Sequence, residues 1–193
     1  MYWVLFFALM QAQDERPSPG RPEAVVQRLY AQIVKSRPLG IPTEADRAVL
    51  WPLLTPRLAG ILVTAERCQE DYFRQHPDPD LKPEFGWLEV GLFSGPDEMA
   101  LPSEVNVVGT DALTRGRHVV HVEFTYRDSI FGRAGDPDYT FRWRGEVIVE
   151  QGTRGFLVDD FRRIDAASNK RLRALSQQFV GCRGTRWVGY RRK

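Results

Sequence analysis

The sequence predicts an α+β protein in which N-terminal helices pack on a curved antiparallel sheet, followed by a C-terminal helical extension. Apolar residues recur at helical spacing in the first part of the chain and alternate with polar residues further on. Such alternation indicates strands with one face in the core and one face in solvent, and the helices are available to cover the apolar face. The 193 residues, 42% of them apolar, suffice for one domain with a real core.

The start of the chain predicts a signal peptide over residues 1–12 and a linker over residues 13–21. The first ten residues form an uncharged apolar run that is too short to span a bilayer, and Ala12 supplies a small residue for cleavage. The proline-rich stretch that follows has the composition of a flexible spacer. The alternative is an apolar N-terminal strand packed in the core. With the leader, we expect an exported protein, periplasmic or extracellular, without a stable membrane span.

Residues 22–165 predict the α+β domain itself, which opens with three helices. Pro22 suits the first position of the first helix. Thr43 caps the second helix, with Asp46 at the capping-box position, and Thr55 caps the third. The apolar stripe of the third helix consists of Leu58, Ile61, Leu62, Ala65, Cys68 and Tyr72.

Five strands are expected after the helices, and the last two are joined by a hairpin turn over Gln151–Gly155. The expected strands are Phe85–Phe93, Val105–Val108, Arg117–Arg127, Tyr139–Glu150 and Phe156–Ile164. The extension, residues 166–193, predicts a helix capped by Ser168 with Leu172, Leu175 and Phe179 facing inward.

Two short motifs resemble those of the nuclear-transport-factor-2-like superfamily, in particular its uncharacterised exported bacterial members. The first is Pro-Glu-Ala-Val-Val-Gln-Arg-Leu-Tyr over residues 22–30, and the second is Gly-Phe-Leu-Val-Asp-Asp over residues 155–160. The resemblance covers about residues 22–165 and implies a cone-shaped fold. It implies little about function, because this fold hosts isomerases, hydrolases, transport adaptors and binding modules.

The two cysteines predict one disulfide between Cys68 and Cys182, because exported proteins keep paired cysteines oxidised. The bond would pin the extension across the third helix. In the alternative interpretation, Cys68 is a small buried apolar residue of that helix.

Asp160 and Tyr126 are the candidate catalytic residues. By strand alternation Asp160 shares a face with Phe156 and Val158, and a carboxyl group in an apolar cavity has a raised pKa and can act as a general base. The resemblance implies a tyrosine partner for an oxyanion, a role open to Tyr126. The residues expected to line the cavity are Phe124, Tyr126, Trp143 and Asp160. The sequence favours the alternative, in which Asp160 forms a structural pair with an arginine.

No metal and no cofactor are expected. His76, His118 and His121 show no metal-ligand spacing, and His118 and His121 point to opposite faces of one strand. There is no recognisable glycine-rich phosphate loop and no nucleophile motif.

Nucleic acid is not an expected partner, because the net charge is only +2 and export would separate the chain from cellular nucleic acid. The basic tail, in which Trp187 and Tyr190 interrupt a series of arginines, resembles a weak nucleic-acid or acidic-surface patch. A solvated basic tail is the favoured interpretation.

Three functions remain open on these grounds. The first is an exported non-catalytic binding module for a small apolar ligand or a protein partner. The second is a cavity enzyme of isomerase or hydrolase type with Asp160 as its base. The third is an inhibitor or toxin-immunity protein that acts through the exposed face of the sheet. The oligomeric state is open, a dimer included.

Overall fold

The computed structural model describes residues 20–78, 87–88, 90–95, 101–114, 116–128 and 139–190. The expected signal peptide and nearly all of the expected linker lie outside these residues. The helices are α1 (Pro22–Ser36), α2 (Glu44–Leu50) and α3 (Pro56–Gln75), with a 3-10 turn, η1 (Trp51–Leu53), after α2. The strands of the main sheet are β1 (Glu104–Thr114), β2 (Arg117–Asp128), β3 (Tyr139–Gly152) and β4 (Gly155–Ile164). The extension holds a 3-10 turn, η2 (Leu175–Gln177), and two short strands, β5 (Cys182–Arg183) and β6 (Arg186–Trp187).

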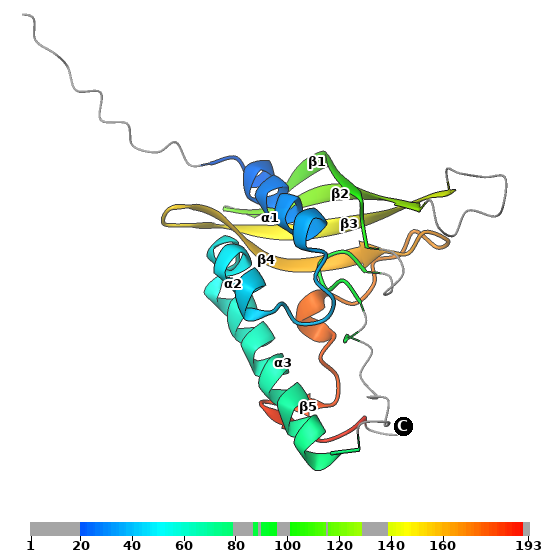
Figure 1. Cartoon of the computed structure of the whole chain (residues 1–193). Coiled ribbons are helices and arrows are strands. Elements are labelled where there is room, and N and C mark those ends of the chain that lie inside the picture. Colours follow the sequence, from blue (N-terminus) through cyan, green and yellow to red (C-terminus); the bar gives the residue numbers. More distant parts are fainter. Residues whose placement is uncertain are drawn as a thin grey trace, which may run out of the picture.

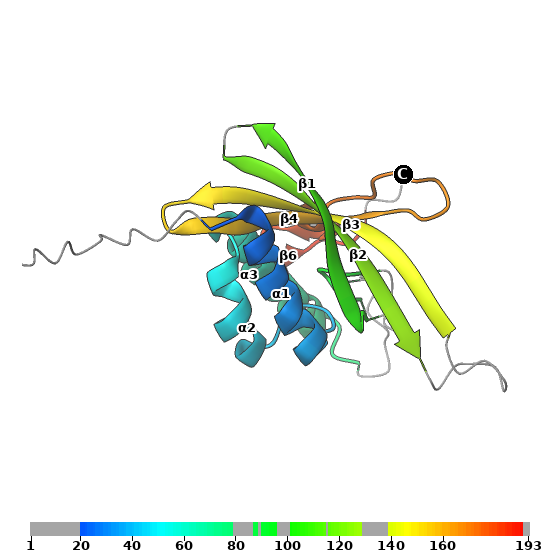
Figure 2. The ribbon, with the colours of Figure 1, turned by 90° about the horizontal axis from the view of Figure 1, so that it is seen from above.

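The predicted α+β class is confirmed. The four main strands form an antiparallel sheet in the order β1-β2-β3-β4, and the helices lie on one side of it (Figure 1). Helix α1 contacts all four strands, whereas α3 starts beside β4 and runs away from the sheet toward β5 and β6. Seen from above, the strands fan out with the usual twist (Figure 2).

Local capping explains where the three helices begin. Pro22 and Pro56 occupy the first turns of α1 and α3, where a missing N–H costs nothing. Thr43 and Asp46 form a capping box at α2, as the sequence predicts, and the Thr55 hydroxyl accepts from the backbone N–H of Leu58 at 3.2 Å.

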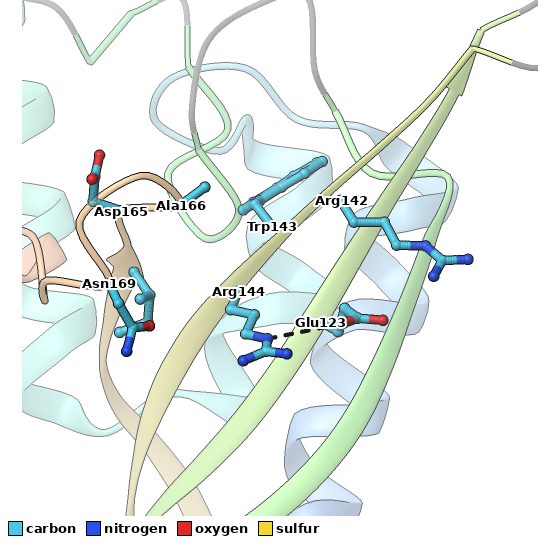
Figure 3. Close-up of a pocket in the computed structure, with 8 residues that line it drawn as sticks. Glu123, Arg142, Trp143, Arg144, Asp165, Ala166 and Asn169 are labelled. Atoms are coloured by element: carbon cyan, nitrogen blue, oxygen red, sulfur yellow. Dashed lines mark ion pairs between the residues drawn. The ribbon is translucent and has the colours of Figure 1, made fainter.

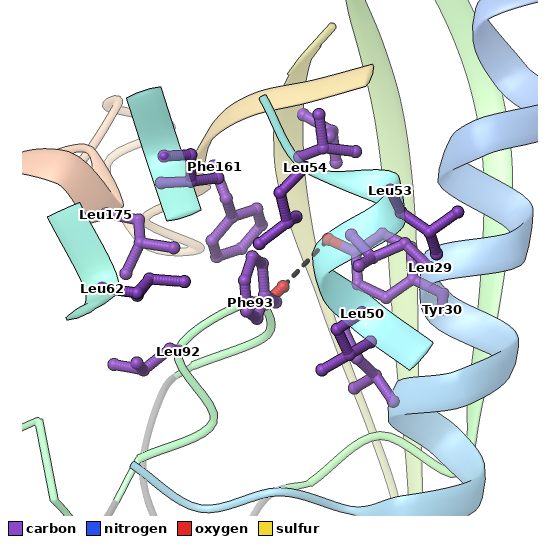
Figure 4. Close-up of a cluster of buried hydrophobic side chains, with 14 of the residues drawn as sticks. Leu29, Tyr30, Leu50, Leu53, Leu54, Leu62, Leu92, Phe93, Phe161 and Leu175 are labelled. Carbon is purple, nitrogen blue, oxygen red and sulfur yellow. Dashed lines mark hydrogen bonds between the residues drawn. The ribbon is translucent and has the colours of Figure 1, made fainter. Parts of the chain in front are cut away.

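The core lies between the helices and the sheet (Figure 4). Leucines of α1, α2 and α3 meet aromatic rings of the sheet there. The Tyr30 hydroxyl donates to the backbone carbonyl of Phe93 at 2.9 Å, and burial raises the pKa of Tyr30 well above its usual value. This bond attaches the segment after α3 to α1.

The strand expected over Phe85–Phe93 is not formed in the part of it that the structure describes, residues 87, 88 and 90–93. Gly91 makes one isolated bridge with Gly40, and the chain then turns, with the N–H of Ser94 donating to the carbonyl of Gly91 at 2.9 Å. The turn, rather than a strand, brings Phe93 into the core.

The helix expected after Ser168 is also wrong in the described residues, where the extension is largely irregular. The N–H of Leu172 donates to the carbonyl of Arg163 at 2.8 Å, and that of Asp165 donates to the carbonyl of Lys170 at 2.8 Å. The chain therefore folds back along the end of β4, and this pairing uses backbone groups that a helix would need.

A disulfide joins Cys68 of α3 to Cys182 of β5, as the sequence predicts, across a separation of 114 residues. Trp187 reinforces this attachment: its backbone N–H donates to the Asp71 carboxylate at 3.0 Å, and its ring packs edge-on against Tyr72 at 5.3 Å. The extension is thus fixed along the second half of α3.

Replacing Cys182 by Ser should lower the free energy of unfolding by up to about 4–5 kcal/mol, because the unfolded chain loses a cross-link that closes a long loop. Urea titration followed by tryptophan fluorescence measures this, since Trp187 should also lose its packing. Reductant should destabilise the native protein and leave the Cys182→Ser variant unchanged. Equal stability of variant and native protein under oxidising conditions would contradict a structural role for the bond.

Candidate functional site

The space between sheet and helices, where an apolar cavity was expected, is filled by aromatic rings. Phe124 and Trp143 stack with ring centroids 5.2 Å apart, and Phe161 meets Phe124 edge-on at 6.0 Å. All three are at most 3% exposed. A Cβ atom at Gly145 would lie 2.6 Å from the Phe161 ring, so only glycine fits beneath this cluster. The Trp143 indole N–H donates to the Ser94 carbonyl at 2.7 Å, which fixes its ring.

Asp160 does not share a face with Phe156 and Val158, because a β-bulge interrupts the alternation of β4. Val149 of β3 pairs with Val158, but its neighbour Ile148 pairs with Asp160, which leaves Asp159 as the extra residue. The bulge turns Asp160 away from the apolar face. Sequence alternation alone gives the opposite result, since it assumes a regular strand.

Asp160 is held by structural partners. One carboxylate oxygen accepts from the Ser176 hydroxyl at 2.5 Å, and the other accepts from the N–H groups of Ser176 at 3.1 Å and Phe161 at 2.9 Å. The Arg57 guanidinium lies 3.6 Å away. The contact with Arg57 matches the arginine pairing that the sequence favours. The hydrogen bonds from Ser176 attach the extension to β4.

Tyr126 and Asp160 are not brought together. Ile148 pairs with both Val119 and Asp160, and Tyr126 lies seven residues further along β2 than Val119. At about 3.3 Å per residue, the two side chains are separated by about 20 Å. Tyr126 is half-buried and packs against the edge of the core.

The bulged residue Asp159 anchors the N-terminus of α3 to the sheet. Its carboxylate accepts from Arg57 at 2.8 Å, from the Thr55 hydroxyl at 2.9 Å and from Arg117 at 3.3 Å. Burial raises the pKa of Asp159, but the hydrogen bonds from Arg57 and Thr55 and the charges of Arg57 and Arg117 outweigh it and lower the pKa below its usual value. Asp159 is therefore an ionised structural carboxylate.

Two hollows with charged linings lie on the solvent-facing side of the sheet. One, of about 250 Å³, lies between the end of β3 and the loop after β4 (Figure 3). A second, of about 500 Å³, shares Arg144, Ile164 and Asn169 with the first. We call the two together the open-face groove. The side chains of Arg142, Arg144 and Glu123 line one wall, and Asp165 and Asn169 stand on the other (Figure 3).

A buried carboxylate forms part of the groove lining. Glu146 is only 5% exposed, and Arg171 of the extension donates to both of its oxygens at 2.8 to 3.1 Å. Arg162 lies 3.8 Å from it and His121 3.9 Å. The pKa of Arg171 is raised by this hydrogen bonding and by the charge of Glu146. Both oxygens of Glu146 therefore accept hydrogen bonds from Arg171, and these bonds fix this wall of the groove.

His121 links the groove to β1. Its Nε2 lies 2.8 Å from the Asp111 carboxylate, and its Nδ1 faces Glu146. It stands on the solvent-facing side of the sheet, as the sequence predicts. Among the described residues no set of three or more His, Cys, Asp and Glu side chains could hold a metal ion.

The sequence pattern does not single out the groove. Glu146 occupies a polar position of an alternating strand, and nothing in that alternation distinguishes it from exposed Glu150. Its burial depends on Arg171, which reaches it because the extension folds back along β4. The only signal is the density of arginines at alternate positions of β3 and in the extension.

Comparisons with protein-family models, curated proteins and solved structures found no match to this chain. Among the described residues no helix has both the length and the apolar character needed to span a membrane. The groove must therefore be interpreted from its own chemistry.

Replacing Asp159 by Asn should lower the free energy of unfolding by about 1–3 kcal/mol at neutral pH, because Arg57 and Thr55 lose a charged acceptor. The pKa of Asp159 is lowered in the folded state, so its contribution is complete above the ordinary value of 3.8 and is lost as the pH falls below it. Urea titrations at several pH values measure both effects.

The matched control is Glu70→Gln on the exposed side of α3, which should change stability little at any pH. A deficit of Asp159→Asn that stayed constant down to pH 3 would show that the ionised carboxylate is not what stabilises the contact.

Proposed function

We propose that the protein is an exported, non-catalytic binding module that engages a protein partner through the open-face groove. The observation that carries this proposal is the contrast between the two faces of the sheet. The covered face is filled by Phe124, Trp143 and Phe161, whereas the open face is hollowed and lined by charged side chains. The open face therefore offers a partner a hollowed surface with charged side chains.

The lining of the groove favours a polar protein surface over a small apolar ligand. Arg142 and Arg144 are exposed and stand two residues apart on β3, so they point the same way about 7 Å apart. Glu123 and Asp165 add the opposite charge, and Asn169 adds an amide. Groups of both signs spread along a groove suit the rim of a protein interface, where electrostatic complementarity sets specificity.

The predicted leader and the disulfide together support export. Disulfides persist in oxidising compartments, and this one joins two buried or half-buried cysteines in a structural position. The order of three helices followed by an antiparallel sheet also supports the proposed likeness to the nuclear-transport-factor-2-like superfamily.

The geometry of the described residues supports the other two candidate functions to different extents. A cavity enzyme gains no support, because Asp160 faces Ser176 and Arg57 and lies far from Tyr126. An inhibitor or toxin-immunity protein is a special case of the proposed module, one in which the partner is an enzyme or a toxin.

Site-specific cross-linking tests the proposal. A photoreactive amino acid in place of Arg142 or Asn169, at the two walls of the groove, should give one discrete higher-mass adduct in the native host. The matched controls carry the same group at Gln27 or Lys35, on the exposed side of α1. These should give no such adduct, because they face away from the groove.

Charge reversal then checks specificity. Arg144→Glu should reduce the adduct formed at Asn169 at least about tenfold, since a fully engaged charge pair contributes about 1.5–3 kcal/mol. Adducts of equal yield from the α1 positions, or an adduct insensitive to Arg144→Glu, would place the interface elsewhere.

A further inference from the structure

The charges of the chain are divided unevenly between the domain and the extension. Residues 166–193 carry eight of the 27 Lys and Arg residues and none of the 25 Asp and Glu residues. The rest of the chain therefore holds 19 basic and 25 acidic residues and is net negative by six. The small total charge of +2 hides a strongly basic segment attached to an acidic domain.

The structure concentrates part of this charge far from the open-face groove. The β5–β6 hairpin lies beside the end of α3 that points away from the sheet (Figure 1). Arg183 and Arg186 face each other across this hairpin, and both are exposed. In the part of the chain that the structure describes, no carboxylate lies within ion-pair distance of either guanidinium.

Exposed apolar side chains surround the same hairpin. Val188 is 61% exposed, Tyr190 41% and Val180 39%. The N–H of Val188 donates to the carbonyl of Gly181 at 2.8 Å, so Val188 lies opposite the residue that follows Val180. Tyr190 packs edge-on against the Trp187 ring at 5.5 Å and lines a shallow hollow together with Val180. We call Arg183, Arg186, Val180, Val188 and Tyr190 the hairpin patch.

We propose that the hairpin patch docks the protein on the surface of an anionic lipid bilayer. The arginines would pair with headgroup phosphates, and the valines and Tyr190 would enter the boundary between headgroups and acyl chains. A bilayer surface satisfies both kinds of side chain at once. The hairpin is held rigidly for this, because the Cys68–Cys182 disulfide and the Asp71–Trp187 hydrogen bond fix it to α3.

An acidic protein or a nucleic acid fits the patch less well. Either would neutralise Arg183 and Arg186, but neither would take the exposed side chains of Val180 and Val188 out of water. The sequence continues beyond Tyr190 with Arg191, Arg192 and Lys193, which adds three positive charges directly after the patch. Docking at this end leaves the open-face groove accessible, so the proposal is independent of the proposed function.

Vesicle co-sedimentation tests the proposal, with the full chain and its disulfide intact. Vesicles containing phosphatidylglycerol should bind the protein, and pure phosphatidylcholine vesicles should bind at least about tenfold less, with the difference abolished in 0.5 M salt. Arg183→Glu/Arg186→Glu should weaken binding to the anionic vesicles by at least about tenfold. The matched control, Arg28→Glu/Lys35→Glu on α1, makes the same change in net charge and should bind as the native protein does.

Val188→Ser separates a lipid surface from a soluble polyanion, because it keeps the charge and removes an apolar group. It should weaken vesicle binding several-fold and leave any binding to poly-glutamate unchanged. The proposal is overturned if both double variants bind vesicles equally. It is also overturned if Val188→Ser has no effect on vesicles while poly-glutamate competes fully, which would assign the patch to an acidic protein. Intact-mass measurement of the disulfide and circular dichroism confirm that each variant is folded.

Discussion

The β-bulge at Asp159 determines how the helices and the extension attach to the sheet. Because one extra residue is inserted in β4, Val158 and Phe161 both face the core, while Asp159 and Asp160 both become anchors. The first holds the N-terminus of α3 through Thr55 and Arg57, and the second holds η2 of the extension through Ser176. A regular strand would place one of these carboxylates against the aromatic cluster. The bulge thus accounts for the filled interior and for the covered edge of β4.

The fold was largely predictable because its signals are local. Thr43, Thr55 and the prolines set the helix starts, and the alternation in β2 and β3 set the strands. What escaped prediction depends on contacts between distant segments. The side to which Asp160 points follows from a bulge that no alternation reveals, and the irregular extension follows from its pairing with β4. The groove could not be predicted for the same reason, since the burial of Glu146 requires Arg171, 25 residues away in the sequence.

The two proposed surfaces lie at different ends of the molecule, and α3 connects them. Its N-terminus is fixed to the sheet by Asp159, and its second half carries the hairpin through Cys68, Asp71 and Tyr72. A helix with its hydrogen bonds satisfied internally is a stiff spacer, so partner binding at the groove and docking at the hairpin patch need not interfere. The acidic character of the domain and the basic character of the extension would also orient the molecule near a charged surface.

The disulfide has a consequence for the order in which the chain matures. Cys182 lies 114 residues after Cys68 in the sequence. When the chain is synthesised or exported from its N-terminus, Cys68 therefore stays unpaired until all four strands of the main sheet have followed it. With two cysteines in the sequence, no wrong intramolecular pairing competes during that interval. Formation of the disulfide is then the last step, since the sheet can assemble before the two cysteines pair. Before this step, the basic hairpin has only the contacts of Trp187 with Asp71 and Tyr72 to attach it to the second half of α3.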